Sequence, residues 1–226
     1  EANWYNTNWQ YRKHITIAGT MTANTTQTNF PLMVRRTSDS DLASRAQGDG
    51  DDILFTSLDG STKLDHEIEK YVSSTGELWS WVRISTLPTG TATVIYMYYG
   101  NSGASRQQNA TGAWNSNFKG VWHLKETSGG SGAIKDSTSN GHNVTDTNSP
   151  NLGATDQIGN AISFDSTNTG DVAQLRLSAG AELPPAQQMW TSLRVGIRSP
   201  AKRMRITLKE AEIAKSQLIT DDEVWS

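Results

Sequence analysis

Alternation of apolar and polar residues predicts β-strands along the first hundred residues. In the clearest case, 77–84, every second residue falls on one face, which comprises Leu78, Ser80, Val82 and Ile84. Further strands are predicted at 11–17, 29–34, 53–56, 64–71 and 93–99, with a short helical turn near 38–45. A short loop at 88–90 separates 77–84 from 93–99, so we expect these two strands to pair as antiparallel neighbours.

The second half repeats the pattern after a polar stretch. Residues 102–117 are rich in Gly, Gln and Asn, which is typical of a linker. A new strand set is predicted to begin at 121–124, with later strands at 161–164 and 172–177 and a capping box at 220–223 that predicts a short final helix. The pattern therefore predicts an all-β chain of two β-sandwich modules, 1–101 and 118–226, joined by the linker 102–117.

Composition agrees with a β-sandwich and limits the partners. Apolar residues make up 35% of the chain and the rest is rich in Ser, Thr, Asn and Gly, as when one face of each strand is buried. The net charge is −3 without a long basic run, which argues against nucleic acid. The longest apolar run, 94–99, is far too short to cross a bilayer, so we expect no membrane insertion.

The cysteine content and the first residues are compatible with an extracytoplasmic location. The chain has no Cys, which excludes thiolate metal sites and cysteine nucleophiles. It begins at Glu1–Ala2 instead of Met, and we expect a processed N-terminus of the kind that signal-peptide removal leaves. An extracytoplasmic protein with a large core can fold without disulfides.

Short motifs in the first half carry a family resemblance. They are Trp9, YRK at 11–13, ITI at 15–17, NFP at 29–31, GDDI at 50–53, FT at 55–56, DGSTKL at 59–64, HEIE at 66–69, WV at 81–82 and MYYGN at 97–101. With these motifs, residues 4–101 resemble the bacterial and archaeal family called domain of unknown function 2341. The resemblance implies an exported protein in which this domain precedes a laminin-G-like domain, and it implies no particular chemistry.

The second half resembles the start of a laminin-G-like, concanavalin-type jelly roll. The residues are FKGVWHLKE at 118–126, DSTSNGHN at 136–143 and IGNAISFD at 158–165, with a faint likeness to its end at 204–224. Residues 181–203 are too few for the central strands of such a fold at about 5–6 residues per strand. We therefore expect a truncated module, a segment missing from the sequence, or a sheet that a second copy completes by strand addition.

Tryptophan and tyrosine residues are the candidate ligand contacts. Trp4, Tyr5 and Trp9 near the N-terminus are suited to an exposed aromatic surface. Trp79 and Trp81 share one strand face and are suited to stacking on sugar rings, although burial in the sandwich core is the simpler interpretation.

One acidic cluster suggests a metal. Asp49, Asp51, Asp52 and Asp59 lie in a glycine-containing loop and would supply hard oxygen ligands for Ca²⁺, although the full EF-hand spacing is absent. The competing interpretation is that these Asp residues cap backbone amides in turns.

Two pairs of residues raise the question of catalysis. Glu67 and Glu69 share a strand face, as the paired carboxylates of a glycosidase require, but exposed strand positions explain them more simply. His66–Glu67 lacks the second His of a zinc-peptidase helix and lies in a predicted strand. We therefore expect a non-catalytic, exported binding or adhesion module for glycan or protein. The alternatives are a self-associating structural subunit of a filament or envelope complex and, more weakly, a glycan-active enzyme.

Overall fold

The computed structural model describes residues 3–21, 25–145, 151–155 and 158–163 of the 226-residue chain. The described part is nearly all β. Its strands are β1 (Tyr11–Ile17), β2 (Gln27–Arg36), β3 (Leu54–Ser57), β4 (Lys63–Leu64), β5 (His66–Val72), β6 (Glu77–Leu87), β7 (Thr93–Tyr99), β8 (Asn151–Thr155) and β9 (Asn160–Ser163). Its helices are the 3-10 turn η1 (Gly19–Met21), α1 (Ser40–Arg45) and α2 (Ala110–Ala113).

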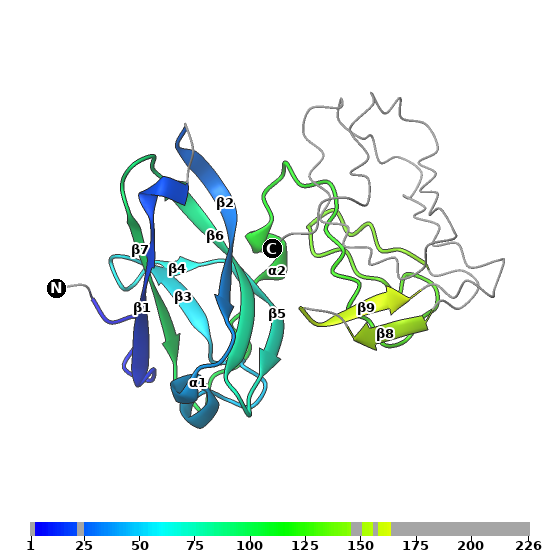
Figure 1. The fold of residues 1–226 in the computed structure, drawn as a ribbon, viewed down its shortest axis with the longest axis horizontal. Helices are drawn as coiled ribbons and strands as arrows, with labels where there is room; N and C mark the ends of the chain where they lie inside the picture. Colours follow the sequence, from blue (N-terminus) through cyan, green and yellow to red (C-terminus); the bar gives the residue numbers. More distant parts are fainter. Residues whose placement is uncertain (1–2, 22–24, 146–150, 156–157, 164–226) are drawn as a thin grey trace.

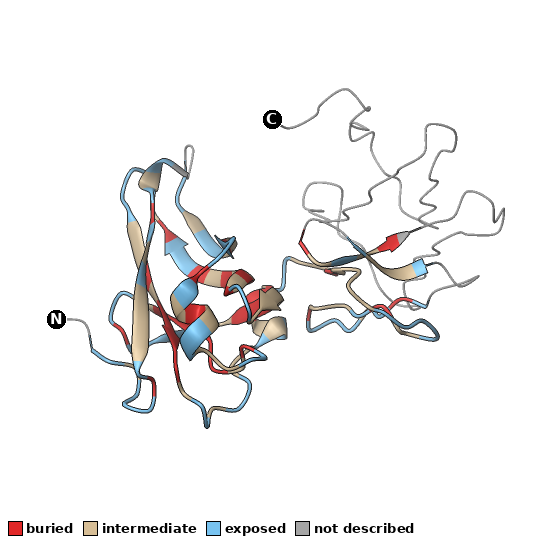
Figure 2. Ribbon diagram, turned by 60° about the horizontal axis from the view of Figure 1, so that its bottom comes forward, coloured by how far each residue is buried: buried red, intermediate tan, exposed pale blue. Residues whose placement is uncertain are grey.

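The first seven strands form two antiparallel sheets that face each other (Figure 1). Sheet A has the order β1-β7-β3-β4, and sheet B has the order β2-β6-β5. Apolar residues from both sheets, such as Phe55, Leu78, Val82 and Met97, are fully buried between them. Figure 2 shows the buried positions concentrated between the two layers. The predicted β-sandwich of the first half is confirmed.

Alternation assigns residues to faces correctly. Along β6 the four residues that alternation groups on one face, Leu78, Ser80, Val82 and Ile84, are all buried. Pro31, whose missing N–H suits it to an edge strand, lies in β2 at the edge of sheet B. Periodicity groups residues by face because successive side chains of a strand point to opposite sides of the sheet, and the contact with the opposite sheet decides which face is the inner one.

The predicted pairing of the strands at 77–84 and 93–99 is wrong. β6 pairs with β2 and β5 in sheet B, whereas β7 pairs with β1 and β3 in sheet A. Each is a central strand with both edges occupied, so the connection at 88–92 crosses from one sheet to the other. Proximity in sequence favours a hairpin, but the order of strands depends on contacts between residues far apart in the chain.

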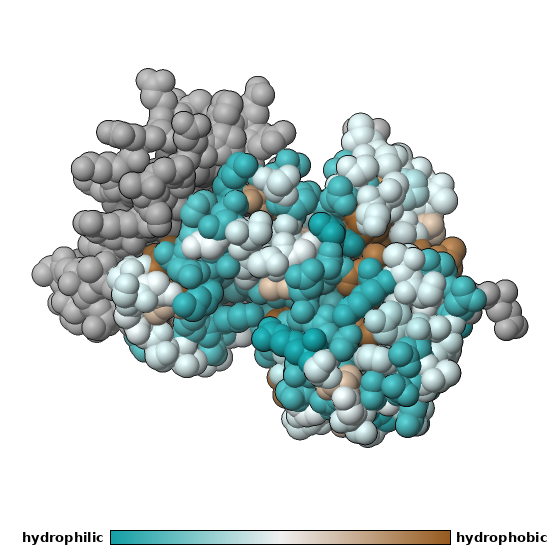
Figure 3. Space-filling view, turned by 180° about the vertical axis from the view of Figure 1, so that it is seen from behind, coloured by the Kyte–Doolittle hydropathy of each residue, from teal (hydrophilic) through white to brown (hydrophobic). Residues whose placement is uncertain are grey.

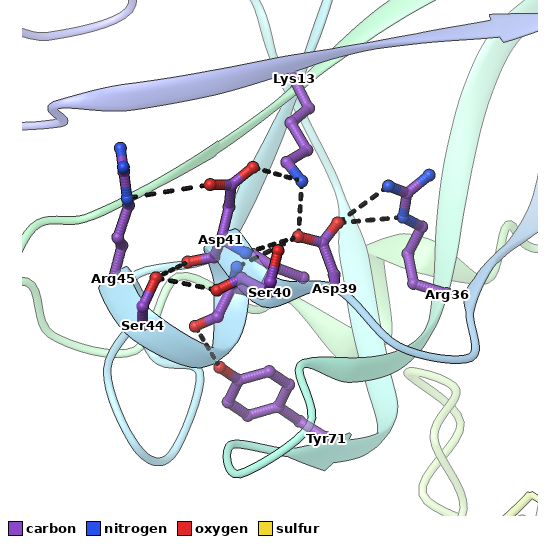
Figure 4. Close-up of polar contacts among 9 residues, drawn as sticks. Lys13, Arg36, Asp39, Ser40, Asp41, Ser44, Arg45 and Tyr71 are labelled. Carbon is purple, nitrogen blue, oxygen red and sulfur yellow. Dashed lines mark hydrogen bonds and ion pairs between the residues drawn. The ribbon is translucent and has the colours of Figure 1, made fainter.

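A cluster of charges around the start of α1 ties the two sheets together (Figure 4). Asp39 caps the helix by accepting from the amides of Asp41 and Leu42. Its carboxylate, 1% exposed, also forms ion pairs with Lys13 of β1 and Arg36 of β2. Gly76 fits here because a Cβ at this position would lie only 2.0 Å from the Asp39 carbonyl oxygen.

The segment predicted to be a linker lies against sheet B. The amide of Asn109 donates to the carbonyl of His66, and the amide of Ile68 donates to Oε1 of Gln108. Ala113 and Trp114 are buried together with Val121, and the side chains of Trp81 and Phe118 pack against them. In Figure 1, α2 accordingly lies between the sandwich and the second half of the chain.

Beyond residue 118 the described residues contain the hairpin β8–β9 and an isolated bridge between Ile134 and Val144. The strand predicted to begin at 121–124 does not form, and Leu124 has a φ of +58°, outside the extended region. A complete laminin-G-like sandwich is not shown. The elements predicted at 172–177 and 220–223 lie outside the described residues. No helix in the described part of the chain is long and apolar enough to cross a membrane.

Candidate functional site

The N-terminal segment lies on the outer face of sheet A. Trp9 is buried there with Leu54 of β3 and Tyr98 of β7, and its indole N–H donates to the Asp52 carbonyl at 2.7 Å. Tyr5 packs edge-on against Trp9, with ring centroids 5.3 Å apart. Of the three aromatic residues predicted near the N-terminus, Trp9 therefore anchors the segment and Tyr5 is half-buried beside it.

Trp4 remains available at the surface, with 41% of the residue exposed. Its indole N–H donates to the Trp9 carbonyl at 2.8 Å, which fixes the ring. The Arg12 guanidinium lies 4.8 Å from the Trp4 ring and 4.3 Å from the Tyr96 ring. Arg12 Nη1 also donates to the Tyr98 hydroxyl and the Asn3 carbonyl. The cation and both rings are therefore held in place before any ligand arrives.

We call Trp4, Arg12, His14 and Tyr96 the aromatic face. His14 is exposed on β1, one strand from Tyr96, with ring centroids 5.8 Å apart. Leu58, 56% exposed, lies in the neighbouring β3–β4 turn, which Asn3 contacts by donating its amide to the Asp59 carbonyl. Figure 3 shows a largely hydrophilic surface on one side of the molecule.

Trp79 and Trp81 lie on the outer face of sheet B, so the interpretation that they fill the sandwich core is wrong. Trp79 donates to Glu77 at 2.8 Å, and Arg35 stacks 4.4 Å from its ring. Trp81 donates to Glu69 and packs against Trp114 at 5.3 Å. Both rings are half-buried among protein partners, which leaves them less accessible than Trp4.

The four predicted calcium ligands have separate environments. Asp52 is fully buried, and its carboxylate accepts from the amides of Gln47, Gly100 and Asn101. It therefore ties the loop before β3 to the end of β7.

Asp59 caps its own turn by accepting from the amides of Ser61 and Thr62 and from two hydroxyls, which lowers its pKa. Asp49 accepts from the amide of Asp51. Among the described residues no group of three or more acidic or His side chains is arranged to hold a metal ion. The geometry gives Asp52 and Asp59 the roles of turn and loop caps, and Ca²⁺ binding stays a prediction.

A second polar cluster joins sheet B to the residues that follow. Glu67 of β5 is 4% exposed, and its carboxylate accepts from the Trp114 indole at 2.8 Å and from the Ser137 hydroxyl at 2.7 Å. His123 Nε2 lies 3.1 Å from the same carboxylate, and His123 Nδ1 lies 3.5 Å from Glu69. We call Glu67, Glu69 and His123 the interface cluster.

The interface cluster is charged. Burial alone would raise the pKa of Glu67, but hydrogen bonds from His123 and Trp114 and the nearby positive charges lower it. Burial alone would lower the pKa of His123, but the hydrogen bonds and negative charges of Glu67 and Glu69 raise it to about 9. At neutral pH His123 is therefore an imidazolium beside an ionised Glu67.

One comparison with known proteins bears on this arrangement. Residues 49–123 match the model of a family described as a domain of unknown function (DUF2341). The match supports the family resemblance of the first half. It begins in the acidic loop, passes the predicted boundary at 101 and ends at His123, so it contains all three residues of the interface cluster. Neither a curated protein nor a solved structure matches this chain.

Sequence reasoning missed the interface cluster. The interpretation of Glu67 and Glu69 as solvent-exposed strand positions is wrong, because residues 114–137 cover this face of sheet B. Alternation does place both carboxylates on the outer face, and it gives no information about what lies on that face. The aromatic and small residues of 113–122 are the only local signal that this segment packs against something.

Proposed function

We propose that the chain is a non-catalytic binding module that works outside the cytoplasm and contacts a glycan with its aromatic face. The observation that carries the proposal is the exposed Trp4, held beside an arginine that lies between two aromatic rings. Sugar rings stack their C–H faces on such aromatic surfaces, and guanidinium and imidazole groups donate to their hydroxyls. Because the Trp4 ring is already fixed, little side-chain entropy is lost on binding.

The environment of the buried carboxylates supports a non-catalytic role. A glycosidase needs one carboxyl group that can protonate the leaving oxygen and one that can reach the sugar. Glu67 is instead surrounded by Trp114, Ser137 and His123, and its lowered pKa keeps it ionised. Glu67 therefore has the contacts of a buried carboxylate that stabilises the fold.

Two parts of the proposal rest on resemblance. We propose that the residues after 118 continue as a laminin-G-like sandwich, since 118–126, 136–143 and 158–165 resemble its start and β8–β9 is a hairpin. The extracytoplasmic location rests on the exported character of the family that the first half resembles.

The decisive experiment compares two variants on a glycan array. Trp4→Ala removes the exposed ring of the aromatic face, and Phe30→Ala removes a ring that is equally exposed, at 40%, on the opposite sheet. We expect Trp4→Ala to weaken glycan binding about tenfold or more, as the loss of one stacking contact implies. Phe30→Ala should bind like the unaltered protein.

Three results would contradict the proposal. They are the absence of glycan binding by the unaltered protein, equal binding by the Trp4→Ala variant, and equal weakening by both variants. Running the array in Ca²⁺ and in EDTA tests the predicted calcium dependence at the same time. Capture of a protein ligand through Trp4, without glycan binding, would replace the glycan with a protein partner.

A further inference from the structure

The His123 side chain is inserted between two carboxylates that belong to the other half of the structure. Its side chain is 4% exposed, and those of Glu67 and Glu69 are 5% and 13% exposed. The contacts span 56 residues in sequence between His123 and Glu67. Because no β-ladder joins the described residues after 118 to sheet B, this cluster and its apolar surroundings make the connection.

Charged and neutral groups of the described residues face the cluster from several elements. Glu67 and Glu69 come from β5, and Lys125 approaches Glu67 at 3.8 Å from the same segment as His123. Trp81 of β6 donates to Glu69 and Trp114 donates to Glu67, so both carboxylates also have neutral donors. The Trp114 ring lies 5.9 Å from the His123 ring. Positive charge on His123 therefore lies directly between two neighbouring carboxylates in a mostly buried site.

The backbone changes direction immediately after His123. Leu124 has a φ of +58°, in the left-handed region that a leucine adopts only at an energetic cost. Its side chain packs with the second cluster of apolar residues, which contains Ile134, Val144 and Ile162. His123 thus faces sheet B while Leu124 faces the second half of the chain. Such strain persists only where the packing on both sides holds it.

We propose that the interface cluster is a protonation-dependent latch that fixes residues 118–145 against the outer face of sheet B, with Leu124 as its hinge. Loss of the His123 proton would leave Glu67 and Glu69 as two buried carboxylates with a neutral ring between them. Glu67 would keep Trp114, Ser137 and Lys125 as partners, and Glu69 would keep Trp81, but the positive charge between the two carboxylates would be gone. Removing the cation from a buried ion pair is destabilising, so the segment is held less strongly and can move away, which lets Leu124 relax.

The direction of the pH effect follows from His123. Its pKa is raised in the closed form, so the latch is fully effective below the ordinary His value and is lost as the pH rises towards about 9. Glu67 determines the lowest pH at which the latch stays closed. Its pKa is lowered in the closed form, so its stabilisation of the closed form is lost as the pH falls below the ordinary Glu value. The latch is therefore closed at mildly acidic to neutral pH and opens under alkaline conditions.

Distance measurements between two spin labels test the latch directly. The chain has no Cys, so Ser74→Cys in the β5–β6 turn and Ser139→Cys after the latch, both exposed, give a doubly labelled protein without further changes. We expect one narrow distance distribution at pH 6.5 that broadens through a midpoint near pH 9. Far-ultraviolet circular dichroism over the same series follows the sandwich itself.

Two variants separate the latch from a merely structural contact. His123→Gln keeps a similar size and a hydrogen-bond donor but cannot carry charge, so its distribution should be broad already at pH 6.5 and unaffected by pH. His142→Gln alters a histidine of the same segment whose ring contacts the Lys119 carbonyl, and it should keep the wild-type response. A narrow distribution for His123→Gln at both pH values would overturn the proposal.

A second readout does not depend on any movement of the segment. The ¹⁵N chemical shifts of the His123 ring should report an imidazolium at pH 7.5 that loses its proton near pH 9. Deprotonation of His123 near pH 6.5, or an unchanged distance distribution up to pH 10 in the unaltered protein, would overturn the latch.

Discussion

At the scale of single residues, two neighbours on β5 differ in charge at neutral pH: His66 is neutral and Glu67 is ionised. His66 points into the sandwich, is fully buried and lies edge-on to Phe55 at 5.2 Å. Neither of its ring nitrogens has a hydrogen-bond partner among the described residues. Burial lowers its pKa to about 4, although nearby backbone groups of Leu64 and Ile53 partly offset the effect. Glu67, one residue on, faces the opposite side of the sheet and stays ionised.

The buried His66 makes the protein sensitive to acid. Because its pKa is lowered from 6.5 to about 4 on folding, the unfolded chain binds a proton that the folded chain excludes. Stability is therefore lost as the pH falls from about 6.5 to about 4, and the loss attributable to this residue is about 3 kcal/mol. Urea unfolding of the unaltered protein and of His66→Leu at pH 7 and pH 4.5 measures the difference.

Phe55→Leu provides the control for this measurement. It loosens the same contact but keeps the histidine, so its stability should follow the pH dependence of the unaltered protein from a lower starting point. Equal acid sensitivity in His66→Leu and the unaltered protein would show that other groups, such as the ionised carboxylates, account for all of it.

At the scale of secondary-structure elements, α1 depends on a single carboxylate. Asp39 caps the helix and pairs with one cation from each sheet, as Figure 4 shows. Burial alone would raise the pKa of Asp39, but hydrogen bonds from Lys13 and Arg36 lower it. Its contribution to stability is accordingly present above the ordinary Asp value and is lost as the pH falls below it.

Asp39→Ala should lower the free energy of unfolding by about 2–3 kcal/mol, since it removes a helix cap and leaves Lys13 without its most buried partner. Asp39→Asn keeps an oxygen that can cap the helix and loses only the charge, so it should cost less. Thermal unfolding at pH 7 compares them. Equal losses in the two variants would mean that the cap itself contributes little.

Elements were predictable to different degrees. The strands β1 and β7 match their predicted ranges of 11–17 and 93–99, because strong alternation between clear turns is a local property. The pairing of β6 and β7 was not predictable from the loop between them. The strand predicted to begin at 121–124 does not form, and Leu124 there has a left-handed backbone conformation that the sequence pattern does not indicate.

At the scale of the whole molecule, the stable unit extends past the predicted boundary at residue 101. Gln108 and Asn109 hydrogen-bond to the backbone of β5, an edge strand of sheet B, and Trp114 packs on Trp81 and donates to Glu67. An uncovered edge strand tends to pair with other chains. The match to one family model, at residues 49–123, likewise continues past residue 101.

Two fragments test this extent. A fragment of residues 1–145 should be monomeric and give a well-dispersed NMR spectrum, whereas 1–101 should unfold at lower temperature or aggregate. The shorter fragment leaves Glu67, Glu69 and the Trp81 ring uncovered at the surface. If 1–101 unfolded at the same temperature as 1–145, the docked segment would contribute no stability.

The sequence by itself determined the class of the fold, the position of most strands in the first half and which residues of a strand share a face. These properties follow from alternation and turn residues, which act over a few positions along the chain. It also identified Trp4, Tyr5 and Trp9 as an aromatic group, although it did not show that Trp9 is the buried anchor.

Only the tertiary structure decided which strands pair, which carboxylates are buried and where the two halves meet. Glu67 contacts Ser137 across 70 residues and His123 across 56. No local pattern encodes such a contact, because the energy of burying a charge depends on the groups that surround it after folding. Asp52, predicted as a metal ligand, is another example: after folding its carboxylate is surrounded by three backbone amides, from which it accepts hydrogen bonds.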